Sequence, residues 1–260
     1  MSEERTATGL FSLKGRVAII TGGSKGLGLA IAEAFAAAGS DLVLTSRHLD
    51  EVQSEASRLA AATGRVVVGV ESDVADERQV DRLVDDTLNR FGKVDILVNN
   101  AGTNAPGPVE ELSRADFDRT LAVNLTGPWM MCRAVAKSMK QAGYGRVINI
   151  SSALGVVAAS DRTAYAASKG ALVLMTRALA LEWAPFGITV NAIAPGPFLT
   201  PMTIPVADSE DMRRFISTEV ALKRWAKPEE IHGAALLLAS EASSFITGAV
   251  LSVDGGWTAH

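Results

Sequence analysis

Hydrophobic residues in this chain gather in seven short runs, and longer alanine-rich stretches separate the runs. Most runs are continuously apolar and rich in β-branched residues, whereas a strand with one exposed face alternates between apolar and polar residues. Such runs are typical of strands inside a parallel sheet that is covered on both faces. The pattern predicts strands at Arg16–Thr21, Asp41–Ser46, Val66–Glu71, Val94–Asn99, Arg146–Ser151, Ile188–Ala194 and Ala249–Val253.

The stretches between the runs are long enough for helices, and several end close to a glycine, which tolerates the left-handed backbone at a helix end. The alternation of strands and helices predicts an α/β fold. We expect a doubly wound, seven-stranded parallel sheet flanked by helices on both faces, with right-handed crossovers. The predicted helices are Gly26–Gly39, Leu49–Thr63, Asp76–Phe91, Ser113–Ala142, Arg162–Phe186 and Pro228–Ser240.

A long connection over residues 195–225 departs from this alternation; it carries four prolines and a short predicted helix near Glu210–Val220. Because long connections in compact domains usually have a function, we expect residues 195–225 to form a lid over a binding site. No repeat or linker divides the chain. Residues 1–260 are therefore predicted to form a single domain that begins with an N-terminal tail, residues 1–12.

Composition and charge narrow the class of protein. The 260 residues carry a net charge of −4 and no long basic run, so nucleic acid is not an expected partner. No apolar run approaches the ~18 residues of a membrane span, and the polar first residues, Met1 to Leu10, lack a secretory core. These features predict a soluble, cytoplasmic protein with no membrane partner.

Neither cysteine nor histidine chemistry is expected. Cys132 is the single cysteine, which excludes an internal disulfide, and its apolar neighbours predict a buried thiol instead of a nucleophile. The three histidines, His48, His232 and His260, lie far apart and show no metal-ligand spacing. We therefore predict no metal site.

A glycine-rich turn, Thr21–Gly28, follows the first predicted strand directly and opens the first predicted helix. Glycines at such a turn let the backbone approach a pyrophosphate, and the helix amino terminus supplies N–H donors and positive potential. The spacing is Gly-x-x-x-Gly-x-Gly, which differs from the common Gly-x-Gly-x-x-Gly dinucleotide motif. A tight turn without a ligand is the alternative, but the flanking strand and helix favour nucleotide binding.

The end of the second predicted strand bears on the choice of cofactor. NAD enzymes commonly place an acidic residue there for the ribose hydroxyls, but this strand ends in Ser46 and Arg47. Arg47 and Lys25 could pair with the 2′-phosphate of NADP, and Ser46 could hydrogen-bond to it. Both cations could instead be solvated surface residues. At the end of the third strand, Asp73 could accept from the adenine amino group or only cap a helix.

Tyr165 and Lys169 lie four residues apart in a predicted helix, so their side chains share one face. An ammonium group beside a phenol favours the phenolate, so we expect Lys169 to lower the pKa of Tyr165 for proton transfer. The hydroxyl of Ser152, thirteen residues upstream, could share a substrate oxygen with the phenol. Ser151 is the competing serine, and only one of the two can face the site because strand neighbours point to opposite sides.

Together these residues resemble the short-chain dehydrogenase/reductase family, across the chain from about residue 13. The resemblance implies a Rossmann domain, and its serine-to-tyrosine interval of thirteen selects Ser152. The matching motifs are Thr21-Gly22-x-x-x-Gly26-x-Gly28, Asp73, Asn99-Asn100-Ala101-Gly102, Asn124, Ser152, Tyr165-x-x-x-Lys169, and Pro195-Gly196 followed by Thr200.

The resemblance implies a role for each catalytic candidate. Tyr165 would be the general acid in reduction and the base in oxidation, while Ser152 would polarise and orient the substrate carbonyl. Lys169 would lower the pKa of Tyr165 and bind the nicotinamide ribose. Asn124 would hold a water that links Lys169 to solvent, although an asparagine inside a helix is often satisfied by backbone carbonyls.

The candidate binding residues form two sets. Substrate is expected to contact Thr103, Asn104, Ala153, Leu154 and Met202, with Phe198 and Trp225 nearby in the lid. The expected cofactor contacts are Gly22, Ser24, Lys25, Gly26, Leu27, Gly28, Ser46, Arg47, Asp73, Val74, Asn100, Ala101, Gly102, Tyr165, Lys169, Pro195, Gly196, Phe198 and Thr200.

The resulting hypothesis is an oxidoreductase that transfers a hydride reversibly between NADP(H), in preference to NAD(H), and a small carbonyl or secondary alcohol. The family resemblance further implies a homotetramer. A methyltransferase that uses adenosyl-methionine also has a glycine-rich turn after its first strand, but it gives no reason for Tyr165 and Lys169. A redox sensor or scaffold that binds NADPH without turnover is the second alternative.

Overall fold

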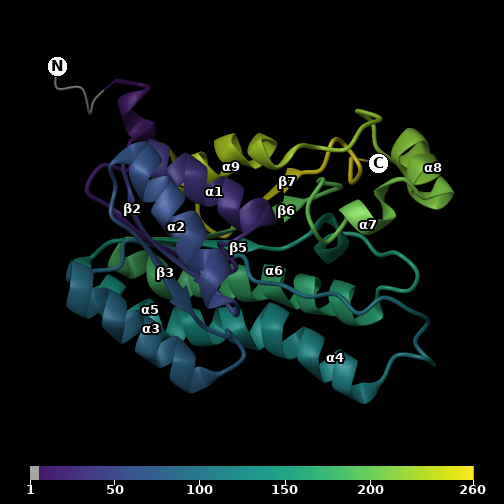
Figure 1. Cartoon of the computed structure of the whole chain (residues 1–260), viewed down its shortest axis with the longest axis horizontal. Helices are drawn as coiled ribbons and strands as arrows, with labels where there is room; N and C mark the ends of the chain where they lie inside the picture. Colours follow the sequence, from purple (N-terminus) through teal and green to yellow (C-terminus); the bar gives the residue numbers. More distant parts are fainter. Residues whose placement is uncertain (1–5, 260) are drawn as a thin grey trace.

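The computed structural model describes residues 6–259, and its centre is a seven-stranded parallel sheet (Figure 1). The strands follow the order β3-β2-β1-β4-β5-β6-β7, so the chain reverses direction across the sheet between β1 and β4. The predicted doubly wound fold is therefore confirmed. The strands are β1 Val17–Ile20, β2 Asp41–Ser46, β3 Val67–Glu71, β4 Ile96–Asn99, β5 Gly145–Ile150, β6 Ile188–Pro195 and β7 Val250–Val253.

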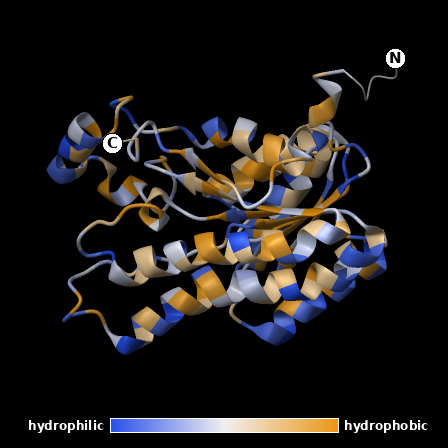
Figure 2. Cartoon of the chain, turned by 180° about the vertical axis from the view of Figure 1, so that it is seen from behind, coloured by the Kyte–Doolittle hydropathy of each residue, from blue (hydrophilic) through white to orange (hydrophobic). Residues whose placement is uncertain are grey.

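Helices cover both faces of the sheet, with α1, α2 and α9 on one side and α3 to α6 on the other (Figure 1). Neighbouring strand residues point into different layers: Ala18 and Ile20 belong to one buried cluster and Ile19 to the other. Figure 2 shows hydrophobic strands at the centre and helices of mixed hydrophobic and hydrophilic colour around them. The helices are α1 Gly26–Ala37, α2 Leu49–Thr63, α3 Glu77–Phe91, α4 Arg114–Leu121, α5 Gly127–Ala142, α6 Thr163–Trp183, α7 Ile204–Ala207, α8 Glu210–Glu219 and α9 His232–Ala239.

The predicted boundaries agree with the structure within one or two residues for most strands, and β2 and α2 agree at both ends. Glycine marks the ends of α2 and α3, where Gly64 and Gly92 have φ values of 67° and 74°. Of the predicted tail, residues 1–5 lie outside the described residues, as does His260, and Gly9–Phe11 form a 3-10 turn. No helix within residues 6–259 is long and apolar enough to span a membrane.

The predicted helix Ser113–Ala142 is not one regular α-helix, because a π-helical turn at Ala122–Thr126 separates α4 from α5. Pro128 gives a physical reason. It has no N–H to donate to the carbonyl four residues earlier, which belongs to Asn124, and π turns arise where that bonding pattern is broken. Gly127 also lets the helix pack closely on the turn after β3, since a Cβ there would lie 2.9 Å from the Val74 carbonyl oxygen.

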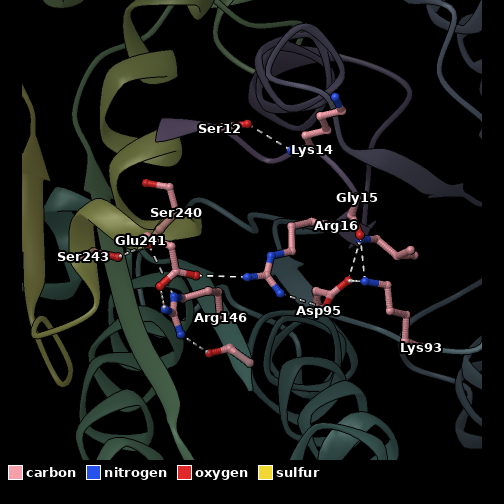
Figure 3. Close-up of polar contacts among 12 residues, drawn as sticks. Ser12, Lys14, Gly15, Arg16, Lys93, Asp95, Arg146, Ser240, Glu241 and Ser243 are labelled. Atoms are coloured by element: carbon pink, nitrogen blue, oxygen red, sulfur yellow. Dashed lines mark hydrogen bonds and ion pairs between the residues drawn. The ribbon is translucent and has the colours of Figure 1, made fainter. Parts of the chain in front are cut away.

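A charge cluster holds the strands together at the edge where β1 and β5 begin (Figure 3). Arg16 pairs with Asp95 and Glu241 at 3.4 and 3.1 Å, and Arg146 pairs with Glu241 at 3.2 Å. Both guanidinium groups also lie against the ring of Tyr144, at 3.7 and 4.4 Å. Because these contacts join segments up to 225 residues apart in the chain, they fix the edge of the sheet opposite to the carboxyl ends of the strands.

The long connection after β6 is anchored at both ends and exposed between them. Phe198 is 2% exposed and forms a bridge with Ala226, and the Leu199 N–H donates to the Ala226 carbonyl at 2.9 Å. By contrast, Met202 and Ile204 are 54% and 59% exposed. The connection therefore presents apolar side chains to solvent above the carboxyl edge of the sheet.

Candidate active site

A cleft of about 350 Å³ opens at the carboxyl ends of the strands, beside the point where the strand order reverses. Open α/β sheets bind ligands at this position. Every predicted cofactor residue except Gly28 lines the cleft. Lining residues that were predicted to bind cofactor are Gly22, Ser24, Lys25, Gly26, Leu27, Ser46, Arg47, Asp73, Val74, Asn100, Ala101, Gly102, Tyr165, Lys169, Pro195, Gly196, Phe198 and Thr200.

The glycine-rich turn has the shape that a dinucleotide requires. Gly22 and Gly26 adopt φ values of 65° and 58°, a conformation that other residues rarely take. Gly28 lies under the turn instead of on the cleft wall: a Cβ there would come within 2.3 Å of the Gly22 carbonyl oxygen and 2.4 Å of Asn100 Nδ2. The turn and the start of α1 therefore fit the pyrophosphate of a nicotinamide dinucleotide.

One end of the cleft carries the predicted phosphate-binding cations. Arg47 is exposed and forms no ion pair within residues 6–259. Lys25 Nζ, however, lies 3.2 Å from Glu51 Oε2, and Ser24 Oγ donates to the same oxygen at 3.4 Å. Glu51 was not a predicted site residue, because an acidic residue in the first turn of a helix is already explained by its favourable interaction with the helix dipole.

Asp73 is held by hydrogen bonds on both carboxylate oxygens. It accepts from the Ala75 N–H at 2.9 Å and from Arg119 Nη2 at 2.9 Å. Burial tends to raise the pKa of Asp73, but these two donors and the nearby positive charge of Arg47 outweigh it, so the pKa lies below its ordinary value. Arg119 also lines the cleft and was missed, since nothing in the spacing of 46 residues relates it to Asp73.

Tyr165 and Lys169 lie together on α6, with Lys169 Nζ 5.8 Å from the centre of the Tyr165 ring. Lys169 is 4% exposed, and its ammonium group donates to the Ile150 carbonyl at 2.7 Å. Burial lowers the pKa of Lys169 to about 8. Burial also raises the pKa of Tyr165, although a hydrogen bond with Ser152 and the charge of Arg162 act in the opposite direction. The expectation that Lys169 lowers the pKa of Tyr165 is therefore wrong for this structure: burial dominates both groups.

The two adjacent serines have different partners. Ser151 Oγ donates to the Lys169 carbonyl at 3.0 Å and thereby ties β5 to α6. Ser152 Oγ accepts from the Leu154 N–H at 3.1 Å and interacts with the Tyr165 hydroxyl. The expectation that only one serine faces the site is wrong, because both lie beyond the end of β5 and line the cleft. Ser152 is nevertheless the serine that the structure brings to Tyr165.

Asn124 lies fully buried in the π-helical turn, close to the reactive groups. Its amide donates to the Thr103 carbonyl at 2.9 Å and to Ser168 Oγ at 3.0 Å, and its Oδ1 accepts from the Thr103 N–H at 2.9 Å. A Cβ on Gly102 would lie 3.5 Å from that oxygen and 3.7 Å from Lys169 Nζ, so the three residues are neighbours. The side chain of Asn124 therefore braces the loop after β4, and both its N–H groups are occupied.

Only part of the predicted substrate wall lines the cleft. Thr103 and Met202 do so, whereas Asn104, Ala153, Leu154 and Trp225 do not. The reason is clear for Ala153, which starts a 3-10 turn and is completely buried. Residues that line the cleft without having been predicted include Thr45, His48, Ser72, Arg119, Val123, Ile150, Pro201 and Thr203.

Comparison with known proteins agrees with the geometry. A family model described as enoyl-(acyl carrier protein) reductase matches residues 22–258. A D-threitol dehydrogenase from Mycolicibacterium smegmatis is 39% identical, over 95% of this chain and 95% of its own. The chain belongs to the short-chain dehydrogenase/reductase family. The predictions of a dehydrogenase family and of an oxidoreductase are confirmed.

Other members of the short-chain dehydrogenase/reductase family show how closely the fold is shared. A gluconate 5-dehydrogenase from Gluconobacter oxydans is 37% identical, over 96% of this chain and 97% of its own. A crystal structure of a gluconate 5-dehydrogenase from Burkholderia cenocepacia, in complex with NADP and tartrate, superposes with a TM-score of 0.94. That structure is 36% identical and covers 98% of this chain and 100% of its own.

Proposed function

We propose that this short-chain dehydrogenase/reductase transfers a hydride reversibly between NADP(H) and a carbonyl or secondary alcohol, with Tyr165 as the general acid and base. The observation that carries the proposal is the convergence of Tyr165, Ser152 and Lys169 in a cleft that also holds Lys25 and Arg47. NADP(H), when bound, supplies or accepts the hydride, and the protein supplies orientation and a proton. Similar proteins with bound NADP support the choice of cofactor.

The side chains of this protein handle the proton. In reduction, Tyr165 gives its phenolic proton to the substrate oxygen while the Ser152 hydroxyl orients that oxygen. The raised pKa of Tyr165 keeps the proton on the phenol at neutral pH. Lys169, with a pKa of about 8, is mostly protonated at pH 7 and can bind ribose hydroxyls. Asn124 joins the loop after β4 to α6 through its hydrogen bonds with Thr103 and Ser168.

Turnover itself is tested by following absorbance of the reduced nicotinamide with each cofactor against ketones, sugars, polyols and β-ketoacyl thioesters. We expect oxidation of NADPH with at least one class. Tight binding of NADPH with no oxidation across the whole panel would instead favour the redox sensor or scaffold.

Arg47 provides a test of cofactor choice. Arg47→Ala is expected to raise KM for NADPH about tenfold and to change KM for NADH much less, because one charge-assisted phosphate contact is lost. The comparison is made by steady-state kinetics at one ionic strength. Arg82→Ala, at an exposed position on α3, is the control and is expected to change neither constant. A wild-type enzyme that uses NADH better would contradict the assignment.

We further propose a sugar-derived substrate, either a polyol or an aldonic acid. The names of the threitol and gluconate dehydrogenases support this class. Arg162 supports the acid in particular. It lies three residues before Tyr165 at the start of α6, its charge acts on Tyr165, and no carboxylate within residues 6–259 pairs with it. Its guanidinium donates to the Asp161 carbonyl at 3.0 Å and does not line the cleft in this structure, so contact with a substrate carboxylate requires the side chain to turn.

Arg162→Gln separates the two substrate classes. We expect KM for gluconate to rise at least about tenfold, because a charge-assisted contact is lost, while KM for threitol stays nearly constant. Arg177→Gln, an exposed arginine later on α6, is the matched control. Equal effects on both substrates would show that Arg162 supports the loop and does not recognise a carboxylate.

We propose three further properties. Residues 1–260 form a single domain in which residues 195–225 act as a lid. Copies of the chain assemble as a homotetramer, and the enzyme acts in the cytoplasm.

Exposed apolar side chains on α5 and α6 support the assembly of copies: Trp129, Leu174 and Leu181 are 46%, 64% and 82% exposed. Light scattering coupled to gel filtration tests the assembly, and a monomeric mass would contradict it.

A further inference from the structure

The phosphate end of the cleft already contains an anionic group of the protein. Glu51 Oε2 accepts from Lys25 Nζ at 3.2 Å and from Ser24 Oγ at 3.4 Å. Both donors belong to the glycine-rich turn and line the cleft. Glu51 lies in the first turn of α2, only four residues beyond Arg47. One carboxylate oxygen thus contacts both of these side-chain donors of the turn.

A phosphate that binds there must displace Glu51 from Lys25 or share Lys25 with it. Sharing places two like charges within a few ångströms of each other, which costs binding energy even at an exposed site. The hydrogen bond from Lys25 lowers the pKa of Glu51, so the carboxylate stays charged at neutral pH and the repulsion persists. A cofactor with a free 2′-hydroxyl meets no such repulsion, since a hydroxyl can donate to a carboxylate.

We propose that Glu51 competes with the 2′-phosphate of NADP(H) for Lys25 and Ser24, and thereby limits the preference of the enzyme for NADP(H) over NAD(H). The inference rests on the proposed function in that it takes the 2′-phosphate to bind at Ser24, Lys25 and Arg47. The Glu51 side chain is 47% exposed and that of Lys25 55%, so both can move when a phosphate arrives. In the cofactor-free protein, Glu51 balances the charge of Lys25.

Glu51→Gln removes the negative charge and keeps the size of the side chain. We expect NADPH to bind about three- to tenfold more tightly, as the loss of one like charge at an exposed site implies, and NADH to bind no more tightly than before. The gain is expected to shrink as salt is added. Asp50→Asn is the matched control, because it removes the same charge from the same turn, whereas Lys25 pairs with Glu51 and not with Asp50 within residues 6–259.

Dissociation constants are measured by titration calorimetry for NADPH and NADH, and also for adenosine 2′,5′-bisphosphate and AMP. The last two ligands test the phosphate site without the nicotinamide. The urea midpoint of each variant is measured as well, because both acidic residues favour the amino end of α2. Glu51→Ala is a second variant and is expected to change affinity in the same direction.

The outcomes separate the inference from the proposed function. Unchanged or weaker binding of NADPH and of the bisphosphate in Glu51→Gln would overturn the role of Glu51, even if the enzyme oxidises NADPH normally. An equal gain in Asp50→Asn would also overturn it, because the gain would then come from the total negative charge at the start of α2 and not from the contact between Glu51 and Lys25. Conversely, tighter bisphosphate binding in an enzyme that turns over no substrate would support the inference while the proposed reaction fails.

Discussion

Tyr165→Phe is expected to lower kcat by at least ~10²-fold, within the usual contribution of a positioned general acid. The substitution keeps the ring that packs beside Lys169 and removes only the hydroxyl that interacts with Ser152. We therefore expect NADPH affinity to change little. Substrate KM is also expected to change less than kcat, because the phenolic proton is transferred only during the reaction.

The second tyrosine of the chain provides the control for this substitution. Tyr144 lies against Arg16 and Arg146 at the opposite edge of the sheet, far from the cleft. Tyr144→Phe makes the same chemical change there and is expected to leave kcat intact. Steady-state kinetics in both directions, with NADPH binding measured separately, compares the two variants. Near-normal turnover by Tyr165→Phe would remove Tyr165 from its proposed role.

Local sequence signals were sufficient for most of the fold. A strand that is apolar at every position buries both of its faces, as strands in a parallel sheet covered by helices do. The continuous β-branched runs therefore identified the strands of such a sheet. Glycine ended α2 and α3 because Gly64 and Gly92 need a left-handed backbone that other residues resist. The glycine-rich turn and its place after β1 likewise follow from adjacent residues. These features depend on a few neighbouring positions, which a sequence displays directly.

The features that sequence analysis missed depend on contacts between distant segments. The contact between Glu51 and Lys25 joins α2 to the turn after β1, and that between Arg119 and Asp73 joins α4 to the turn after β3. Charge effects were also missed: spacing placed Lys169 beside Tyr165 but did not reveal that burial would lower the pKa of Lys169 and raise that of Tyr165. Burial is a property of the packed layers, so the direction of the Tyr165 pKa shift required the structure.

Lys169→Met is expected to have opposite effects on activity and stability. We expect kcat to fall at least about 10²-fold, because the ammonium group proposed to hold the cofactor ribose next to Tyr165 is lost and the reacting groups are no longer well positioned. We also expect the free energy of unfolding at pH 7 to rise by about 1–2 kcal/mol, because a buried charge is replaced by an apolar chain of similar shape. The lost hydrogen bond to the Ile150 carbonyl limits the gain. Functional sites commonly carry such a cost in stability.

The pH dependence identifies the cause of this stability gain. Burial lowers the pKa of Lys169 from its ordinary value of 10.5 to about 8 in the folded protein. Below pH 8 both the folded and the unfolded chain hold the proton, so the folded wild type bears the whole cost of the buried charge. As pH rises from about 8 toward 10.5, the folded protein releases the proton first and the cost disappears.

Urea unfolding at several pH values therefore distinguishes a buried charge from simple packing. The advantage of Lys169→Met over wild type should be full below pH 8 and small near pH 10.5, whereas a packing effect would persist across the range. Lys137→Met, at an exposed position on α5, is the control and is expected to change stability by less than about 0.5 kcal/mol. A destabilised but active Lys169→Met would mean that Lys169 supports the fold and is not needed to hold the cofactor ribose.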